Sequence, residues 1–97
     1  MSDLVKQGQW VWIIVQEKNG NEQFLGQYDN KSNESYIPTF LEKDDALQCI
    51  NLLTRDKSIK HEIQAIQFED LGQSASQNGF LLFVLNGEGE VLEKIEP

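Results

Sequence analysis

The sequence has little of the chemistry that most metal sites and many enzyme centres require. Its 97 residues contain one cysteine, Cys49, and one histidine, His61. A disulfide within the chain is therefore excluded, and so is a zinc site built from several cysteines or histidines. A single free thiol indicates a reducing compartment. We expect neither a metal site nor a cofactor.

Long apolar runs are missing as well. No run approaches the roughly 20 apolar residues that a membrane-spanning helix needs. Residues 1–6 have neither the basic start nor the apolar stretch of a signal peptide. We therefore expect a cytoplasmic protein that does not enter a membrane.

Positive charge is scarce, because eight Lys and Arg residues face sixteen Asp and Glu residues, giving a formal charge of −8. Such a surface repels nucleic-acid phosphates and anionic lipids, so neither is an expected partner. The acids are scattered from Asp3 to Glu96, which is typical of a surface that maintains solubility. A basic protein partner is the sharper alternative, whereas mimicry of nucleic acid would need clustered acids.

β-branched and aromatic segments predict the strands. Residues 10–15 form such a segment, and the following Asn19-Gly20 pair is a strong hairpin signal. Residues 22–28 should then form the partner strand, with Phe24, Gly26 and Tyr28 on one face. Residues 1–9 are polar and are predicted to be frayed. Further strands are expected at residues 36–40, 60–68, 80–85 and 91–95.

Two segments predict helices. Residues 41–54 begin with Glu42, Asp44 and Asp45, which complement the positive end of a helix dipole. An apolar stripe at helical spacing follows from Ala46 to Leu53. Residues 69–77 predict a second, shorter helix that is closed by the Asn78-Gly79 pair.

These elements predict a single α+β domain spanning residues 1–97, in the order β-β-β-α-β-α-β-β. We expect one mixed, mostly antiparallel sheet of five to six strands with two helices on one face. Residues 10–15 and 80–85 are apolar on both faces, which is typical of central strands. Two helices can cover only one face, so the other face should be covered by loops, by the termini or by another molecule.

No constellation of residues points to catalysis. A Cys49–His61 pair could support nucleophilic chemistry, but Cys49 falls on the apolar stripe of the predicted helix and is expected in the core. Gly87 and Gly89 lie between two strands, whereas a dinucleotide-binding loop leads into a helix. No pair among the sixteen acids stands out. We therefore predict no catalytic residues and a protein that is not an enzyme.

Two short patterns resemble a known family. They are Ile37-Pro38-Thr39-Phe40-Leu41-Glu42, at a strand that leads into an acidic helix start, and Phe68-Glu69-Asp70-Leu71, ahead of an apolar strand ending at Asn86. In pattern and layout the chain resembles the SseB-like N-terminal domain, a name associated with enhanced serine sensitivity. It departs from the family at Asn86-Gly87, where the family usually has Asn-Pro. The resemblance implies an α+β fold and a binding or regulatory module without defined catalytic residues.

The leading functional hypothesis is a protein-interaction module that self-associates through the bare sheet face, most simply as a homodimer. The alternative is a small-molecule-binding domain with an apolar pocket near Trp10 and Trp12. Trp10 and Trp12 share one strand face, and aromatic side chains of this kind pack in cores and interfaces. The candidate binding residues are Trp10, Trp12, Ile14, Phe24 and Tyr28.

Overall fold

Seven strands form two sheets in the computed structural model, which describes residues 2–97. One sheet has the strand order β2-β1-β5 and the other β3-β4-β6-β7. Every pairing is antiparallel except that of β4 with β6. The α+β class and the mixed, mostly antiparallel pairing are confirmed, whereas the single sheet is wrong. The strands are β1 (Trp10–Lys18), β2 (Asn21–Phe24), β3 (Gln27–Asp29), β4 (Glu34–Thr39), β5 (Lys60–Gln67), β6 (Leu81–Leu85) and β7 (Val91–Ile95).

The two sheets arise because the strand expected over residues 22–28 breaks in two. Leu25 is buried in the core, and its N–H donates to the carbonyl of Ile14 at 2.8 Å. Gly26 then passes beneath the ring of Phe80, where an added Cβ would lie 2.9 Å from the nearest ring carbon. A larger residue would not fit this close approach, so the chain turns there and starts β3 in the second sheet.

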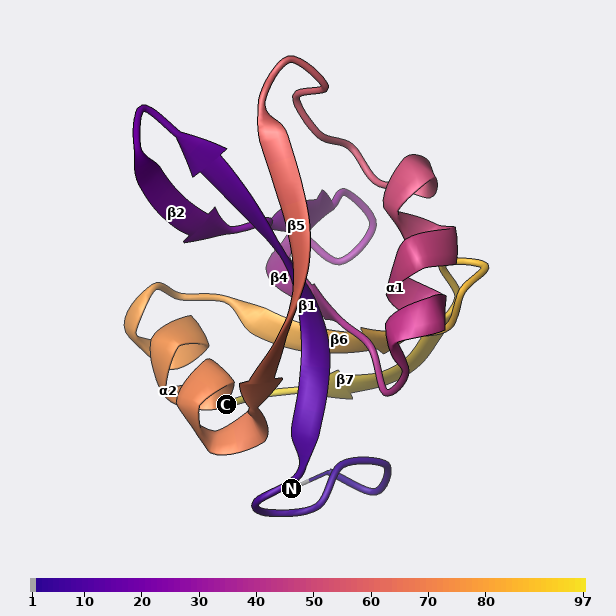
Figure 1. The fold of residues 1–97 in the computed structure, drawn as a ribbon. Coiled ribbons are helices and arrows are strands. Elements are labelled where there is room, and N and C mark those ends of the chain that lie inside the picture. The colour runs from indigo at the N-terminus through magenta and orange to yellow at the C-terminus, as the bar shows by residue number, and fades with distance from the viewer. Residues whose placement is uncertain (1) are drawn as a thin grey trace.

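Each helix packs into a different core cluster, on opposite sides of β1 and β5 (Figure 1). Helix α1 (Lys43–Cys49) continues into the short 3-10 helix η1 (Ile50–Leu52), and α2 (Phe68–Gln77) follows β5. Ala46 and Cys49 of α1 belong to one cluster, whereas Leu71 and Ala75 of α2 belong to the other. The expected placement of both helices on one face is therefore wrong.

Strands β1 and β6 lie at the centres of the two sheets and supply both clusters, as their apolar runs predict. Alternate side chains of a strand point to opposite faces. In β1, Val11, Ile13 and Val15 join the α2 cluster, whereas Ile14 joins the α1 cluster. The expectation of a bare sheet face is thus not met, because the short helices cover one side each.

A groove beside helix α2 as the candidate site

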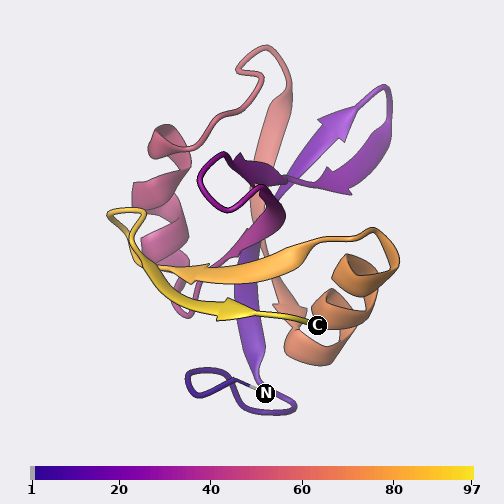
Figure 2. The same cartoon turned by 180° about the vertical axis from the view of Figure 1, so that it is seen from behind.

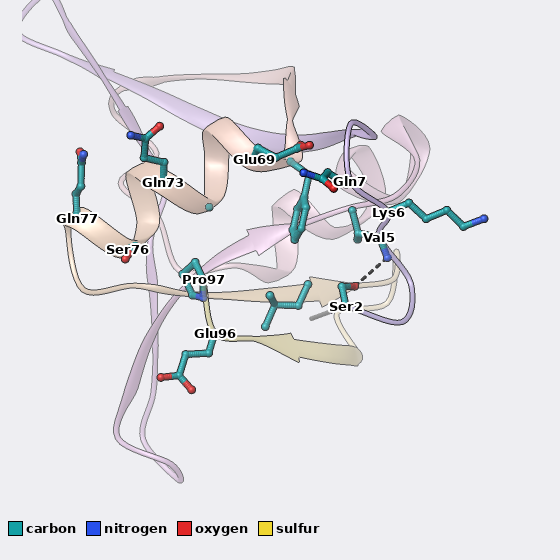
Figure 3. A pocket seen from close by; sticks show the side chains of 13 residues that line it. Ser2, Val5, Lys6, Gln7, Glu69, Gln73, Ser76, Gln77, Glu96 and Pro97 are labelled. Atoms are coloured by element: carbon teal, nitrogen blue, oxygen red, sulfur yellow. Dashed lines mark hydrogen bonds between the residues drawn. The ribbon is translucent and has the colours of Figure 1, made fainter.

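A groove of about 740 Å³ lies between the N-terminal segment, α2 and the end of β7, and Figure 3 shows the side chains that line it. Figure 2 shows the C-terminal end of the chain beside α2. This volume falls within the roughly 300–1,000 Å³ that is typical of ligand-binding clefts. The groove is lined by Ser2, Val5, Lys6, Gln7, Phe68, Glu69, Gly72, Gln73, Ser76, Gln77, Ile95, Glu96 and Pro97.

One wall is the N-terminal segment, which is held in place by the carboxylate of Glu93 on β7. The Ser2 hydroxyl donates to this carboxylate at 2.8 Å, and the N–H groups of Asp3 and Leu4 donate to it at 2.9 and 3.1 Å. The Val5 N–H donates to the Ser2 hydroxyl oxygen at 2.8 Å, and the Val5 side chain is only 3% exposed. These bonds place the N-terminal segment against β7, whereas the fraying expected for residues 1–9 stays a prediction.

Hydrogen bonding also changes the acidity of Glu93. Partial burial alone would raise the pKa of its carboxyl group, but the donors from Asp3, Ser2 and Leu4 favour the ionised form. Together they hold the pKa of Glu93 below its ordinary value. The wall of the groove is therefore tied to an ionised carboxylate.

A second tie joins the N-terminal segment to α2. The backbone N–H of Gly8 donates to the carboxylate of Glu69, in the first turn of the helix. The Phe68 N–H donates to the carbonyl of Gln9 at 2.9 Å. These bonds fix the start of α2 beside the segment, so that one face of the helix forms the second wall.

The groove face of α2 is set by helical spacing. Phe68, Gly72 and Ser76 lie four residues apart and so share one face, whereas Leu71 and Ala75 point into the core. Gly72 has no side chain to fill the space, and an added Cβ would lie 3.7 Å from the Cβ of Pro97. A glycine inside a helix costs about 0.8–1 kcal/mol relative to alanine, and here it keeps the groove open.

The groove has an apolar floor and a polar rim. Val5, Phe68, Ile95 and Pro97 provide apolar surface, while Figure 3 shows Gln73, Ser76 and Gln77 along the α2 side. The charged lining residues are Lys6, Glu69 and Glu96. Such a surface can bury an apolar group while amides and hydroxyls bond its polar neighbours.

The five candidate residues from the sequence do not form one site. Trp10 is 59% exposed, whereas Ile14, on the same face of β1, is fully buried. Phe24 pairs with Val15 and therefore lies on the opposite face. Tyr28 is exposed in the other sheet, where its hydroxyl donates to Asn33 at 3.0 Å.

The pocket expected near Trp10 and Trp12 does not coincide with the groove or with two further cavities of the described residues. Neither tryptophan lines the groove or the two cavities of about 540 and 420 Å³. Phe24 lines the first of these two and Tyr28 the second. The Trp12 ring is instead covered in part by Lys43, whose ammonium lies 5.6 Å from the ring centroid.

Cys49 and His61 lie on different elements. Cys49 is fully buried in α1, and burial, with a smaller contribution from Asp45, raises the pKa of its thiol. The Nδ1 atom of His61 on β5 lies 3.1 Å from the carbonyl oxygen of Ile59. Among residues 2–97, no group of three or more His, Cys, Asp or Glu side chains could hold a metal ion. No helix in this range is long and apolar enough to cross a membrane.

The sequence alone does not predict the groove, because two of its three walls, the N-terminal segment and residues 95–97, come from opposite ends of the chain. The one local indication of the groove is Gly72 in α2, which leaves space between Phe68 and Ser76 on the same face of the helix. The N-terminal wall depends on Glu93, some 90 positions away along the chain.

Comparison of the chain with protein-family models, with curated proteins and with solved structures found no match. The resemblance to the SseB-like N-terminal domain therefore stays a prediction.

Proposed function

We propose that the protein is a non-catalytic interaction module that binds an apolar segment of a partner protein in the groove beside α2. The observation that carries this proposal is a cleft of about 740 Å³ with an apolar floor and a rim of amides and hydroxyls. Apolar clefts with a few polar groups are the usual form of binding sites. The SseB-like resemblance, which implies a binding or regulatory module, agrees with it.

Charge favours a partner segment with basic flanks. The groove lining holds two acids, Glu69 and Glu96, against one base, Lys6. The whole chain carries a formal charge of −8, which attracts cationic partners from a distance. We expect peptides that bind here to combine one or two large apolar side chains with Lys or Arg on either side.

The test uses a random peptide library displayed on phage and panned against the immobilised protein. Enriched peptides should show an apolar centre with basic flanks. Their binding should shift the NMR signals of Val5, Gly72 and Ser76 before those of residues elsewhere.

A matched pair of variants at one position tests the location. Gly72→Leu fills the groove and should weaken peptide binding at least about tenfold, the equivalent of about 1.4 kcal/mol. Gly72→Ala adds one methyl group at ordinary contact distance from Pro97 and should retain most of the binding. Enrichment of no common sequence, or peptides that bind Gly72→Leu as well as the parent, would refute the proposal.

The same volume supports a second candidate function. Clefts of this size also bind small apolar molecules. If the protein binds a small molecule, we therefore expect it in this groove and not beside Trp10 and Trp12. A fragment screen by NMR distinguishes the two, because a small-molecule site should give saturable shifts at Phe68 and Ile95 without any peptide.

A further inference from the structure

Strand β5 has one open edge along its whole length. Trp12 exchanges backbone hydrogen bonds with Phe40, at 2.8 and 2.9 Å, and the Ile14 carbonyl accepts from Leu25. Trp12 and Ile14 thus direct their backbone groups away from β5. In an antiparallel pair, successive residues direct these groups to opposite sides. Val11, Ile13 and Val15 therefore bond to β5.

The register then identifies the free groups of β5. Val11, Ile13 and Val15 pair with Ile66, Gln64 and Glu62. The intervening residues, His61, Ile63, Ala65 and Gln67, direct their N–H and C=O groups outward. Within residues 2–97, β5 pairs with no strand other than β1, and no hydrogen bond reaches the outward backbone groups of His61, Ile63 and Ala65. The carbonyl of Gln67, the N-cap residue of α2, instead accepts the first bond of that helix, so only its N–H is free.

This edge lacks the usual protection against pairing. Proteins commonly shield edge strands by making them short, by bulges, by proline or by charge. The other edge strands follow this pattern, since β2 and β3 have four and three residues and β7 pairs through a bulge. β5 has eight residues in regular register, no proline, and no charge from Ile63 to Gln67.

The edge is also accessible. Figure 1 shows β5 at the front of the molecule, with α1 and α2 to either side and no segment crossing in front of it. The helices cover the two faces of the sheet and leave its rim open. Trp10, which is 59% exposed, lies beside Gln67 at one end of this rim.

We propose that the β5 edge pairs with the β5 edge of a second copy, antiparallel and about a two-fold axis at Gln64. In this register Ile63 lies opposite Ala65 of the second copy, and His61 lies opposite its Gln67. Ile63 and Ala65 then form hydrogen-bonded pairs, and the free N–H of Gln67 can donate to the carbonyl of His61 in the second copy. On the other face Glu62 lies opposite Ile66, so like charges do not face each other directly.

Charge at the two ends of β5 selects the antiparallel arrangement. Residues 55–60, at the start of β5, contain Arg55, Lys57 and Lys60 but only one acid, Asp56, which gives them a net charge of +2. Glu69 and Asp70 follow the end of β5 and carry a net charge of −2. An antiparallel pair brings the basic end of one copy against the acidic end of the other, whereas a parallel pair would oppose like charges.

The first test is the mass of the purified protein in solution by light scattering over a range of concentrations. The parent should reach twice the mass of one chain. Ala65→Pro removes an outward N–H that the fold itself does not use, and proline is tolerated at such edge positions. This variant should stay monomeric, with a circular dichroism spectrum like that of the parent.

A second variant and a control keep the result decisive. Ala65→Lys places a charge at the centre of the edge and should also be monomeric. Leu92→Lys exchanges an exposed apolar residue on β7 and should remain dimeric. A monomeric parent at all concentrations, or a dimer that survives both Ala65 substitutions, would overturn the proposal.

Cross-linking tests the register. Across the proposed axis the two Gln64 residues form a non-hydrogen-bonded pair with Cα atoms about 4.5 Å apart, close enough for a disulfide. Gln64→Cys should yield a covalent dimer on oxidation, whereas Ala65→Cys, which faces Ile63, should not. Equal cross-linking of both variants would contradict pairing at Gln64.

Discussion

Trp12 and Phe40 exchange two backbone hydrogen bonds, of 2.8 and 2.9 Å, and form the isolated bridge between the two sheets. Phe40 is fully buried in the α1 cluster, and its position just after β4 brings the second sheet against β1. The backbone bridge and the buried ring of Phe40 therefore hold the two sheets together at the same position.

Truncation of the Phe40 side chain should lower the stability of the fold strongly. We expect Phe40→Ala to lower the free energy of unfolding by about 3–5 kcal/mol, because it removes a buried ring and leaves a cavity. Urea denaturation followed by circular dichroism measures this change. Leu52→Ala is the control, because Leu52 is 64% exposed and its truncation should change stability by less than about 0.5 kcal/mol. Equal losses in the two variants would contradict the role given to Phe40.

Substitution of Gly72 should raise the free energy of unfolding rather than lower it. Gly72→Ala should stabilise the protein by up to about 1 kcal/mol, because alanine favours the helix and its Cβ meets Pro97 at an ordinary distance. Thermal unfolding should show a higher midpoint than that of the parent. A lower midpoint would mean that the groove face of α2 is more crowded than its contacts indicate.

Acid should release the N-terminal wall of the groove. Because the pKa of Glu93 is lower in the fold than its ordinary value of 4.5, its bonds to Ser2, Asp3 and Leu4 stabilise the fold fully above that value. Their contribution is lost as the pH falls through the lowered pKa. NMR signals of the Asp3 and Leu4 amides should therefore move on titration from neutral pH to about pH 3.

Glu93→Gln is the control for this titration. The variant cannot ionise, so the same amides should be displaced already at neutral pH and should then show little dependence on acid. If the variant titrates like the parent, another carboxylate holds the segment.

Cys49 should be unreactive in the folded protein. Burial raises the pKa of its thiol, so little thiolate forms near neutral pH, and the sulfur is closed to solvent. Ellman's reagent should react at once with unfolded protein and only slowly with the native form. Leu52→Cys, at an exposed position, should supply one fast-reacting thiol in the same assay. Fast reaction of the parent would show that α1 opens readily.

Local sequence predicts which segments of this chain are strands and helices, because each carries its own periodicity. The segment predicted at residues 80–85 is β6, and that predicted at 10–15 lies within β1. The apolar character of both segments also indicates correctly that they are central. Helix α1 is shorter than predicted, because the chain tightens into η1 after Cys49.

The sheet arrangement and the groove could not be predicted in this way. Gly26 looks like an ordinary strand residue until the ring of Phe80, 54 positions later, occupies the space above it. The polar N-terminal segment looks loose until Glu93 supplies its acceptors. The helices separate to opposite sides because β1 offers apolar residues to both, and an apolar run does not reveal which helix covers which side.

The two-sided burial of β1 also governs when the protein can fold during synthesis. β1 leaves the ribosome first among the strands, and only its β2 partner follows directly. The rest of its contacts come from β4 and Phe40, from α1 and from β5, and both core clusters that it joins also contain residues of β6. Its apolar residues are therefore not fully buried until residues up to about 85 have been made. We therefore expect nascent chains stalled before β6 to be sensitive to protease and to bind chaperones at Trp10–Val15, with protection appearing abruptly once β6 emerges.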